Sequence, residues 1–432
     1  MVRRRTVIIG LAALVLTSVG GVVGLRHGSD RVEAVPAVAS PVDRLATSIT
    51  RAQARLRQLP SDYDTWAALG GAYLEQARVT ADPSYYPKAE GALRRSITIR
   101  RNDNAAALIG LGALANARHD FAAARDLARR ALRIDSYSAD AYGVLADAQT
   151  QLGDAAGATA AVQRMLDVRP GLAAYARASY DLELHGRLDE AESLMRRALV
   201  DSVDPADIAF CRYQLGELAW QTGRLDAAAA EYAAGRAADS SYLPLLAGQA
   251  RVAAARGRVG DALAGYAELT ARYPAPAYLI EYADLLHAAR QPARADEQLA
   301  LAAAALRLFA ANGGTDDLGA AQLAIAQHRP GDAVRAAARE WSRRHFADVA
   351  DVLGWALHLA GSDQPALSYA RQASALGTRN ATYLFHRGMI EASLRQTSDA
   401  RRDLSVALML NAHFSPLYAP VAHAALSKLG VR

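Results

Sequence analysis

Glycine-led turns at a nearly constant spacing are the feature that most constrains the fold of this chain. Gly153-Asp154, Gly186-Arg187, Gly223-Arg224 and Gly257-Arg258 follow one another at steps of 33, 37 and 34 residues. Between these turns apolar residues recur every three or four positions, as they do along one face of an α-helix, and an alternating strand pattern is almost absent after residue 61. A period near 34 residues is the size of a helix-turn-helix unit. The sequence therefore predicts an all-α fold, an α-solenoid of about ten helix-turn-helix repeats over residues 61–412.

Small and large apolar residues take fixed places within each period. In one unit Leu215 and Gly216 lie on the first helix, and Ala228 and Tyr232 lie on the second. The same pattern recurs at Trp66, Leu69, Gly70 and Tyr73, at Leu108, Leu111, Gly112, Ala124 and Ala131, at Tyr142, Leu145, Ala146, Ala158 and Val162, at Ala250, Ala262 and Tyr266, at Leu353, Gly354, Ala366 and Ala373, and at Leu384, Gly388, Ala400, Leu404 and Ala407. Small residues let the two helices of a unit approach closely, and large ones fill the space between units. On these residues the chain resembles the tetratricopeptide repeat (TPR) family, in its bacterial membrane-anchored or exported form.

Three units follow the pattern less closely. They cover about residues 172–203, 277–311 and 316–345, and Ala178-Ser179 and Ala283-Asp284 stand where the other units have Leu-Gly. We expect these units to be helical as well. After Asn411 to Pro416 interrupts the pattern, residues 413–432 are expected to form a terminal capping helix over Leu417 to Leu429.

The N-terminus carries a membrane signal. Arg3, Arg4 and Arg5 precede twenty uncharged residues, Thr6 to Leu25, enough for a helix to cross the roughly 30 Å hydrocarbon core of a bilayer. We favour a signal anchor at residues 1–25, a linker and amphipathic helix at residues 26–60, and a single-pass protein of the cytoplasmic membrane whose C-terminal domain is extracytoplasmic, because basic residues stay on the cytoplasmic side. Secretion after cleavage near Ala37-Val38-Ala39 is the alternative.

Motifs for chemistry are missing from the sequence. It contains no HExxH helix, no phosphate loop, no GxSxG turn and no dinucleotide-binding fingerprint. We therefore expect no enzyme activity, no cofactor and no resident metal. Without a stripe of Lys and Arg with interleaved aromatics, we expect no binding of nucleic acid. The single cysteine, Cys211, excludes an intramolecular disulfide and is expected to be a small buried apolar residue. The alternative function is a metal-linked accessory or metal chaperone that uses the histidine-richer C-terminal third: His345, His358, His386, His413 and His423.

The resemblance to TPR proteins implies that the first helices of successive units line a concave groove. Carried over position by position, it gives this set of groove residues: Asp140, Asp147, Tyr180, Glu183, Phe210, Tyr213, Glu217, Trp220, Arg251, Tyr278, Glu281, Asp348, Asp351, Trp355 and His358. The set is acidic and aromatic with one arginine. It predicts a non-catalytic protein-protein interaction scaffold that binds basic and apolar segments of other proteins. The alternative is that these carboxylates form only a solvated face.

Overall fold

The computed structural model describes residues 41–430, which form 22 α-helices and no β-strand. The helices are α1 (Pro41–Gln58), α2 (Tyr63–Thr80), α3 (Tyr85–Ile99), α4 (Ala105–Ala117), α5 (Phe121–Ile134), α6 (Ala139–Leu152), α7 (Ala155–Val168), α8 (Leu172–Leu184), α9 (Leu188–Asp201), α10 (Pro205–Gln221), α11 (Leu225–Ala238), α12 (Pro244–Ala255), α13 (Val259–Arg272), α14 (Pro276–Ala288), α15 (Pro292–Ala311), α16 (Asp317–Ala326), α17 (Pro330–Trp341), α18 (Ala347–Leu359), α19 (Asp363–Ala373), α20 (Ala381–Ser393), α21 (Thr397–Leu410) and α22 (Tyr418–Lys428). The predicted anchor at residues 1–25 and the beginning of the predicted linker lie outside the described residues.

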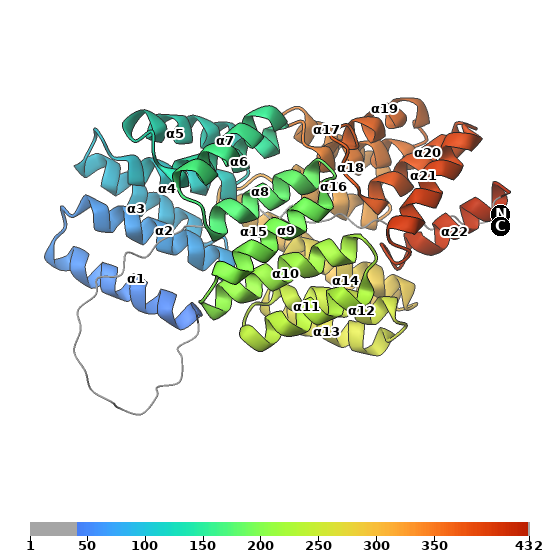
Figure 1. Ribbon diagram of the computed structural model, residues 1–432, viewed down its shortest axis with the longest axis horizontal. Coiled ribbons are helices and arrows are strands. Elements are labelled where there is room, and N and C mark those ends of the chain that lie inside the picture. Colours follow the sequence, from blue (N-terminus) through green and yellow to red (C-terminus); the bar gives the residue numbers. More distant parts are fainter. Residues whose placement is uncertain (1–40, 431–432) are drawn as a thin grey trace.

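Helices α2 to α21 form ten helix-turn-helix pairs, which we number 1 (α2 and α3) to 10 (α20 and α21). The two helices of each pair pack closely on one another, and each pair packs on the next (Figure 1). Helix α1 packs on α2 before the first pair, and α22 follows the last pair where the sequence predicts a capping helix. The all-helical solenoid expected from the sequence is confirmed for the part of the chain that the structure describes.

An alanine stands at the same place near the start of every second helix and is at most 2% exposed: Ala89, Ala124, Ala158, Ala191, Ala228, Ala262, Ala295, Ala333, Ala366 and Ala400. In pairs 2 to 10 the first helix carries another small residue twelve positions earlier, as Gly216 does before Ala228, and in pair 1 Gly70 lies against Ala89 from nineteen positions earlier. A methyl group at Gly216 would lie 2.3 Å from the buried ring of Tyr232, so the small residues set the distance between the two helices.

The three less regular units keep this rule. Ser179 lies twelve positions before Ala191, and its hydroxyl donates a hydrogen bond to the Ala191 carbonyl oxygen at 2.8 Å. In pair 7 the small residue twelve positions before Ala295 is the buried Ala283. The sequence interpretation had given that place to Asp284, and it was wrong by one residue because it followed the position of Leu-Gly rather than the distance to the alanine.

The first helices form the inner layer of the solenoid. In α14 and in α18 eight of the 13 residues are buried, whereas in α15, a second helix, three of 20 are. First helices of successive pairs also pack on each other. Second helices of successive pairs do not pack on each other to the same extent. Side chains that project from the first helices away from their partners therefore meet on the inner face of the superhelix.

The superhelix closes on itself after five pairs. The end of the first helix in each of pairs 1 to 5 contacts the end of the second helix five pairs later, and we call this line of contacts the seam. It comprises hydrogen bonds from Tyr273 Oη to Arg78 O (3.1 Å), from Arg118 Nε to Asn312 O (3.1 Å), from His345 N to Leu152 O (3.4 Å), from Thr378 Oγ1 to Leu184 O, and from Asn411 Nδ2 to Trp220 O (2.7 Å). Its side-chain bonds join residues 191 to 195 positions apart. Pairs 1 to 5 and pairs 6 to 10 thus form two stacked turns.

The regularly spaced glycines form the loops between the two helices of a pair, and in pairs 3 to 5 they also lie at the seam. Gly186 has a φ of 71°, in the left-handed region that ends a helix with little strain only at glycine. A methyl group there would also lie 2.3 Å from the Gly377 carbonyl oxygen across the seam. Gly257 belongs to pair 6, has no pair opposite it, and has nothing within 4 Å of such a methyl group. The regularly spaced glycines of pairs 3 to 5, which predict the repeats, therefore also lie where the two superhelical turns contact each other.

Among residues 41–430, none of the helices combines the length and the apolar content that crossing a membrane requires. The membrane span predicted at Thr6 to Leu25 lies outside this range and stays a prediction.

Candidate binding surface on the inner face

All fifteen predicted groove residues lie on first helices, namely α6, α8, α10, α12, α14 and α18. Tyr213, Tyr278, Asp351 and Trp355 are buried, and the other eleven keep partial exposure. The structure therefore brings the set into one layer. Whether the set binds a partner stays a prediction.

One group of charged side chains centres on Arg251. Its guanidinium group forms ion pairs with Glu217 at 2.7 Å and with Glu281 at 2.9 Å, and the three side chains keep 14 to 19% exposure. The hydroxyl of Tyr232 donates a further hydrogen bond to Glu217 at 2.7 Å. Burial raises the pKa of Glu281, although Arg251 opposes that rise. One arginine thus serves two carboxylates, and the group carries an excess of negative charge when both are ionised.

Glu183 and Asp348 face the same interior, and no described residue forms an ion pair with either, although the charge of Arg344 acts on Asp348. Burial raises the pKa of Glu183 to about 7, and the nearby Glu217 and Asp348 carboxylates add to the rise. Burial likewise raises the pKa of Asp348 to about 6, although the hydroxyl of Tyr383 donates a hydrogen bond to this carboxylate. Ionisation of either carboxyl group is unfavourable in the folded protein. A cation placed beside the carboxylate would make it less unfavourable.

Three predicted carboxylates are already paired with residues that the sequence interpretation missed: Asp140 with Arg169, and the two that follow. Asp147 accepts hydrogen bonds from the buried Arg177 at 2.7 and 2.8 Å, and both oxygens of Asp351 lie 2.9 Å from Nδ1 of the buried His386. The partner stands 30 residues later for Asp147 and 35 for Asp351. These steps are close to one repeat, so a search for opposite charges one period apart would have found these partners.

Asp284 is another residue that the groove set omitted. Its side chain is 0% exposed, and neither oxygen accepts a hydrogen bond from any described residue. Burial, together with the charge of Glu281, raises the pKa of Asp284 well above its usual value. Burial without a hydrogen-bond donor therefore disfavours the charged form of Asp284.

Comparison with known proteins gives a likeness in fold only. No family model and no curated protein matches the sequence. Similar solved structures include a chain of the APC/C hetero-tetramer Cut9–Hcn1 (13% identity over 90% of this chain and 96% of that chain, TM-score 0.40), a tetratricopeptide repeat protein from Parabacteroides merdae (17%, 60% and 98%, 0.35) and yeast Tom70 (14%, 83% and 87%, 0.40). At these identities and TM-scores we carry nothing about partners from those proteins to this chain.

Two histidines of the C-terminal third, His358 and His386, pack on the same indole, that of Trp355, but each is bound to its own carboxylate. His358 contacts Asp363, His386 contacts Asp351, and the ring of His345 lies 4.5 Å from that of Trp341. Within residues 41–430 no three His, Cys, Asp or Glu side chains are grouped so that they could hold a metal ion. Cys211 is 0% exposed, and burial raises the pKa of its thiol to about 11.

Proposed function

We propose that the chain is a non-catalytic protein-protein interaction scaffold whose inner face binds a segment of a partner protein rich in basic and apolar side chains. We further propose that residues 1–25 anchor it in the cytoplasmic membrane, with the solenoid on the extracytoplasmic side. The observation that carries the first proposal is the excess of carboxylates over cations on the inner face. Among the described residues no cation forms an ion pair with Glu183 or Asp348, although the charge of Arg344 acts on Asp348, and Glu217 and Glu281 share one arginine.

Aromatic side chains beside these carboxylates supply apolar contact area. Tyr180, Phe210 and Trp220 are partly exposed, whereas Tyr213, Tyr278 and Trp355 are at most 6% exposed and are used in packing. Partly exposed aromatic rings next to charge are typical anchors in protein interfaces. A lysine or arginine of the partner would neutralise the carboxylates, and its neighbouring apolar side chains would contact these rings.

The proposal predicts that neutralising Glu183 and Asp348 weakens partner capture. The substitutions are Glu183→Gln and Asp348→Asn together, which keep side-chain size and leave the Arg251 ion pairs intact. Capture is measured in cells by crosslinking from a photoreactive residue at Trp220, followed by mass spectrometry. We expect at least a roughly tenfold loss of crosslinked partner at low salt, since each charge-assisted contact contributes about 1 kcal/mol or more.

The matched control neutralises two exposed carboxylates on second helices, Glu190→Gln and Asp226→Asn, and should leave capture unchanged. Equal crosslinking in the inner-face variant and the control, or crosslinking that does not respond to salt, would contradict binding at the inner face. The charge reversals Glu217→Lys and Glu281→Lys are poorer tests, because each also breaks an ion pair with Arg251.

Membrane placement has a direct test because the only cysteine is buried. Tyr137 lies in the turn between α5 and α6 and is 75% exposed. In Tyr137→Cys, we expect a membrane-impermeant maleimide to label the protein in intact cells, in the membrane fraction, while the unsubstituted chain stays unlabelled. Labelling that appears only after lysis would place the solenoid on the cytoplasmic side and overturn this part of the proposal.

A further inference from the structure

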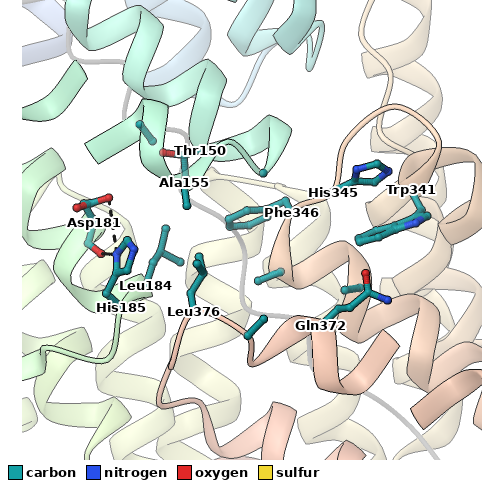
Figure 2. Close-up of a pocket in the computed structure, with 15 residues that line it drawn as sticks. Thr150, Ala155, Asp181, Leu184, His185, Trp341, His345, Phe346, Gln372 and Leu376 are labelled. Carbon is teal, nitrogen blue, oxygen red and sulfur yellow. Dashed lines mark hydrogen bonds and ion pairs between the residues drawn. The ribbon is translucent and has the colours of Figure 1, made fainter. Parts of the chain in front are cut away.

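A cavity of about 490 Å³ lies between the two turns, where pairs 3 and 4 face pairs 8 and 9 (Figure 2). Its walls come from α6 to α8 on one side and from α17 to α19 on the other. Two of its lining residues form seam hydrogen bonds, from His345 N to Leu152 O and from Thr378 Oγ1 to Leu184 O. We call it the seam cavity. It exists only because the superhelix closes after five pairs.

Most of the lining of the seam cavity is apolar. Alanines form much of its surface: Ala155, Ala158, Ala347, Ala350 and Ala375. Leu184, Phe346 and Leu376 add larger apolar surface, and the indole of Trp341 stands at the side away from α8 (Figure 2). The volume is within the range of sites that bind small organic molecules. The space in the cavity is left by the short side chains of the alanines that line it.

The opposite side of the seam cavity carries negative charge. Asp181 lines the cavity there together with His185 (Figure 2). The Asp181 carboxylate accepts a hydrogen bond from the Thr159 hydroxyl, at 2.9 and 3.0 Å from its two oxygens, and lies 3.8 Å from Nδ1 of His185. That Nδ1 is 2.8 Å from the Asp181 carbonyl oxygen and donates to it. The nearby Arg187 is held by Glu190 at 2.6 Å. Among the described residues, no lysine or arginine forms an ion pair with Asp181.

We propose that the seam cavity binds a small organic amine, a molecule with an aromatic or branched apolar body and one ammonium group. The ammonium group would lie at Asp181, and the apolar body would lie against Phe346, Leu376 and Trp341. An aromatic body suits the indole, and a cation suits a carboxylate with which no described lysine or arginine forms an ion pair. The site does not depend on partner capture at the inner face.

Such a ligand would hold the two turns together. It would touch α8 and α18 at once, and these helices are more than 160 residues apart in the chain. A ligand that binds only the closed superhelix stabilises it in proportion to the logarithm of its concentration. The melting temperature should therefore rise with amine concentration.

The test uses the full chain and three probes: 4-phenylbutylamine, its charge-reversed analogue 4-phenylbutyrate, and butylamine, which lacks the ring. Calorimetric titration and thermal melting are measured for each probe. We expect saturable binding and a rising melting temperature with 4-phenylbutylamine only. Absence of binding of this amine at 5 mM, or equal binding of the butyrate, would overturn the proposal.

Two variants locate the binding. Asp181→Asn keeps the side-chain shape and should weaken amine binding at least tenfold. Ala155→Leu fills the cavity from a partly exposed position and should abolish it. The matched control, Asp167→Asn, removes an exposed carboxylate on neighbouring α7 that pairs with Arg164, and binding should be unchanged. Unaltered binding in Asp181→Asn would overturn the assignment of the ammonium site. If an acetylated Phe-Lys amide binds more tightly than the free amine, a small-molecule ligand is excluded in favour of a peptide.

Discussion

Replacing Arg344 by alanine is expected to lower the free energy of unfolding by about 3 kcal/mol and to loosen the contact between the two turns. Arg344 is 4% exposed and lies just after α17. Its guanidinium group donates to Glu340 at 2.5 Å and, across the seam, to Gln151. It also lies 5.0 Å above the ring of Phe121 in pair 2. The substitution removes a buried cation that joins three elements, and leaves the Gln151 oxygen without its donor.

The neighbouring arginine provides the control. Arg343 pairs with the same Glu340 and with Asp317 but is 40% exposed and does not cross the seam. Arg343→Ala is expected to cost at most about 1 kcal/mol, as exposed ion pairs do. Urea unfolding measures both losses, and small-angle scattering measures the radius of gyration, which should grow only in Arg344→Ala. Equal losses and equal radii would show that the seam contact of Arg344 does not stabilise the stacked turns.

Glu183→Gln is expected to stabilise the protein at pH 8 by up to about 3 kcal/mol and to have little effect at pH 4. Burial and the Glu217 and Asp348 carboxylates raise the pKa of Glu183 from 4.5 to about 7. The folded state therefore holds this proton more tightly than the unfolded state does. The stability that the protonated group contributes is present below pH 4.5 and is lost as the pH rises towards 7 and beyond. Glutamine has no proton to lose.

The measurement compares urea unfolding of the variant and the unsubstituted chain at pH 4, 6 and 8. The difference in free energy should grow through this range. Glu190→Gln serves as the control, because Glu190 is exposed and a hydrogen bond from Arg187 lowers its pKa, so this change should not stabilise the protein at pH 8. A Glu183→Gln variant whose advantage is the same at pH 4 and pH 8 would show that Glu183 does not titrate in this window.

The repeat architecture could be predicted from the sequence because nearly every pair carries small residues at the same distance. Small residues corresponding to Gly216 and Ala228 recur in every unit, and the apolar residues between them follow the helical period. The register of α14 was misassigned because Ala283-Asp284 was matched to Leu-Gly by its position along the unit, without its distance to Ala295. The twelve residues from Ala283 to Ala295 give the register, because the same spacing separates Gly216 from Ala228.

The closure of the superhelix was not predictable in this way. It depends on a small rotation between successive pairs that adds up over five of them, and no single motif encodes such a rotation. The inner-face pairing was missed for a related reason. Arg251 was identified as a groove residue, but its two partners stand 34 residues before it and 30 residues after it, so the pairing becomes evident only when the repeats are superimposed.

The seam also has a consequence for the order in which the chain is made. The last helix of pair 5 ends at Ala238, whereas the seam partners of pairs 1 to 5 begin at Tyr273 and end at Asn411. During synthesis the first superhelical turn is therefore complete before the residues that cover its edge have been added. His119 then still lacks its contact with Phe309, and Phe121 still lacks its contact with Arg344. Contacts of such long sequence separation form late and slowly. In a solenoid that relies on neighbours alone, loss of the last unit affects the one before it; here, loss of pair 10 also removes the Asn411 bond from pair 5.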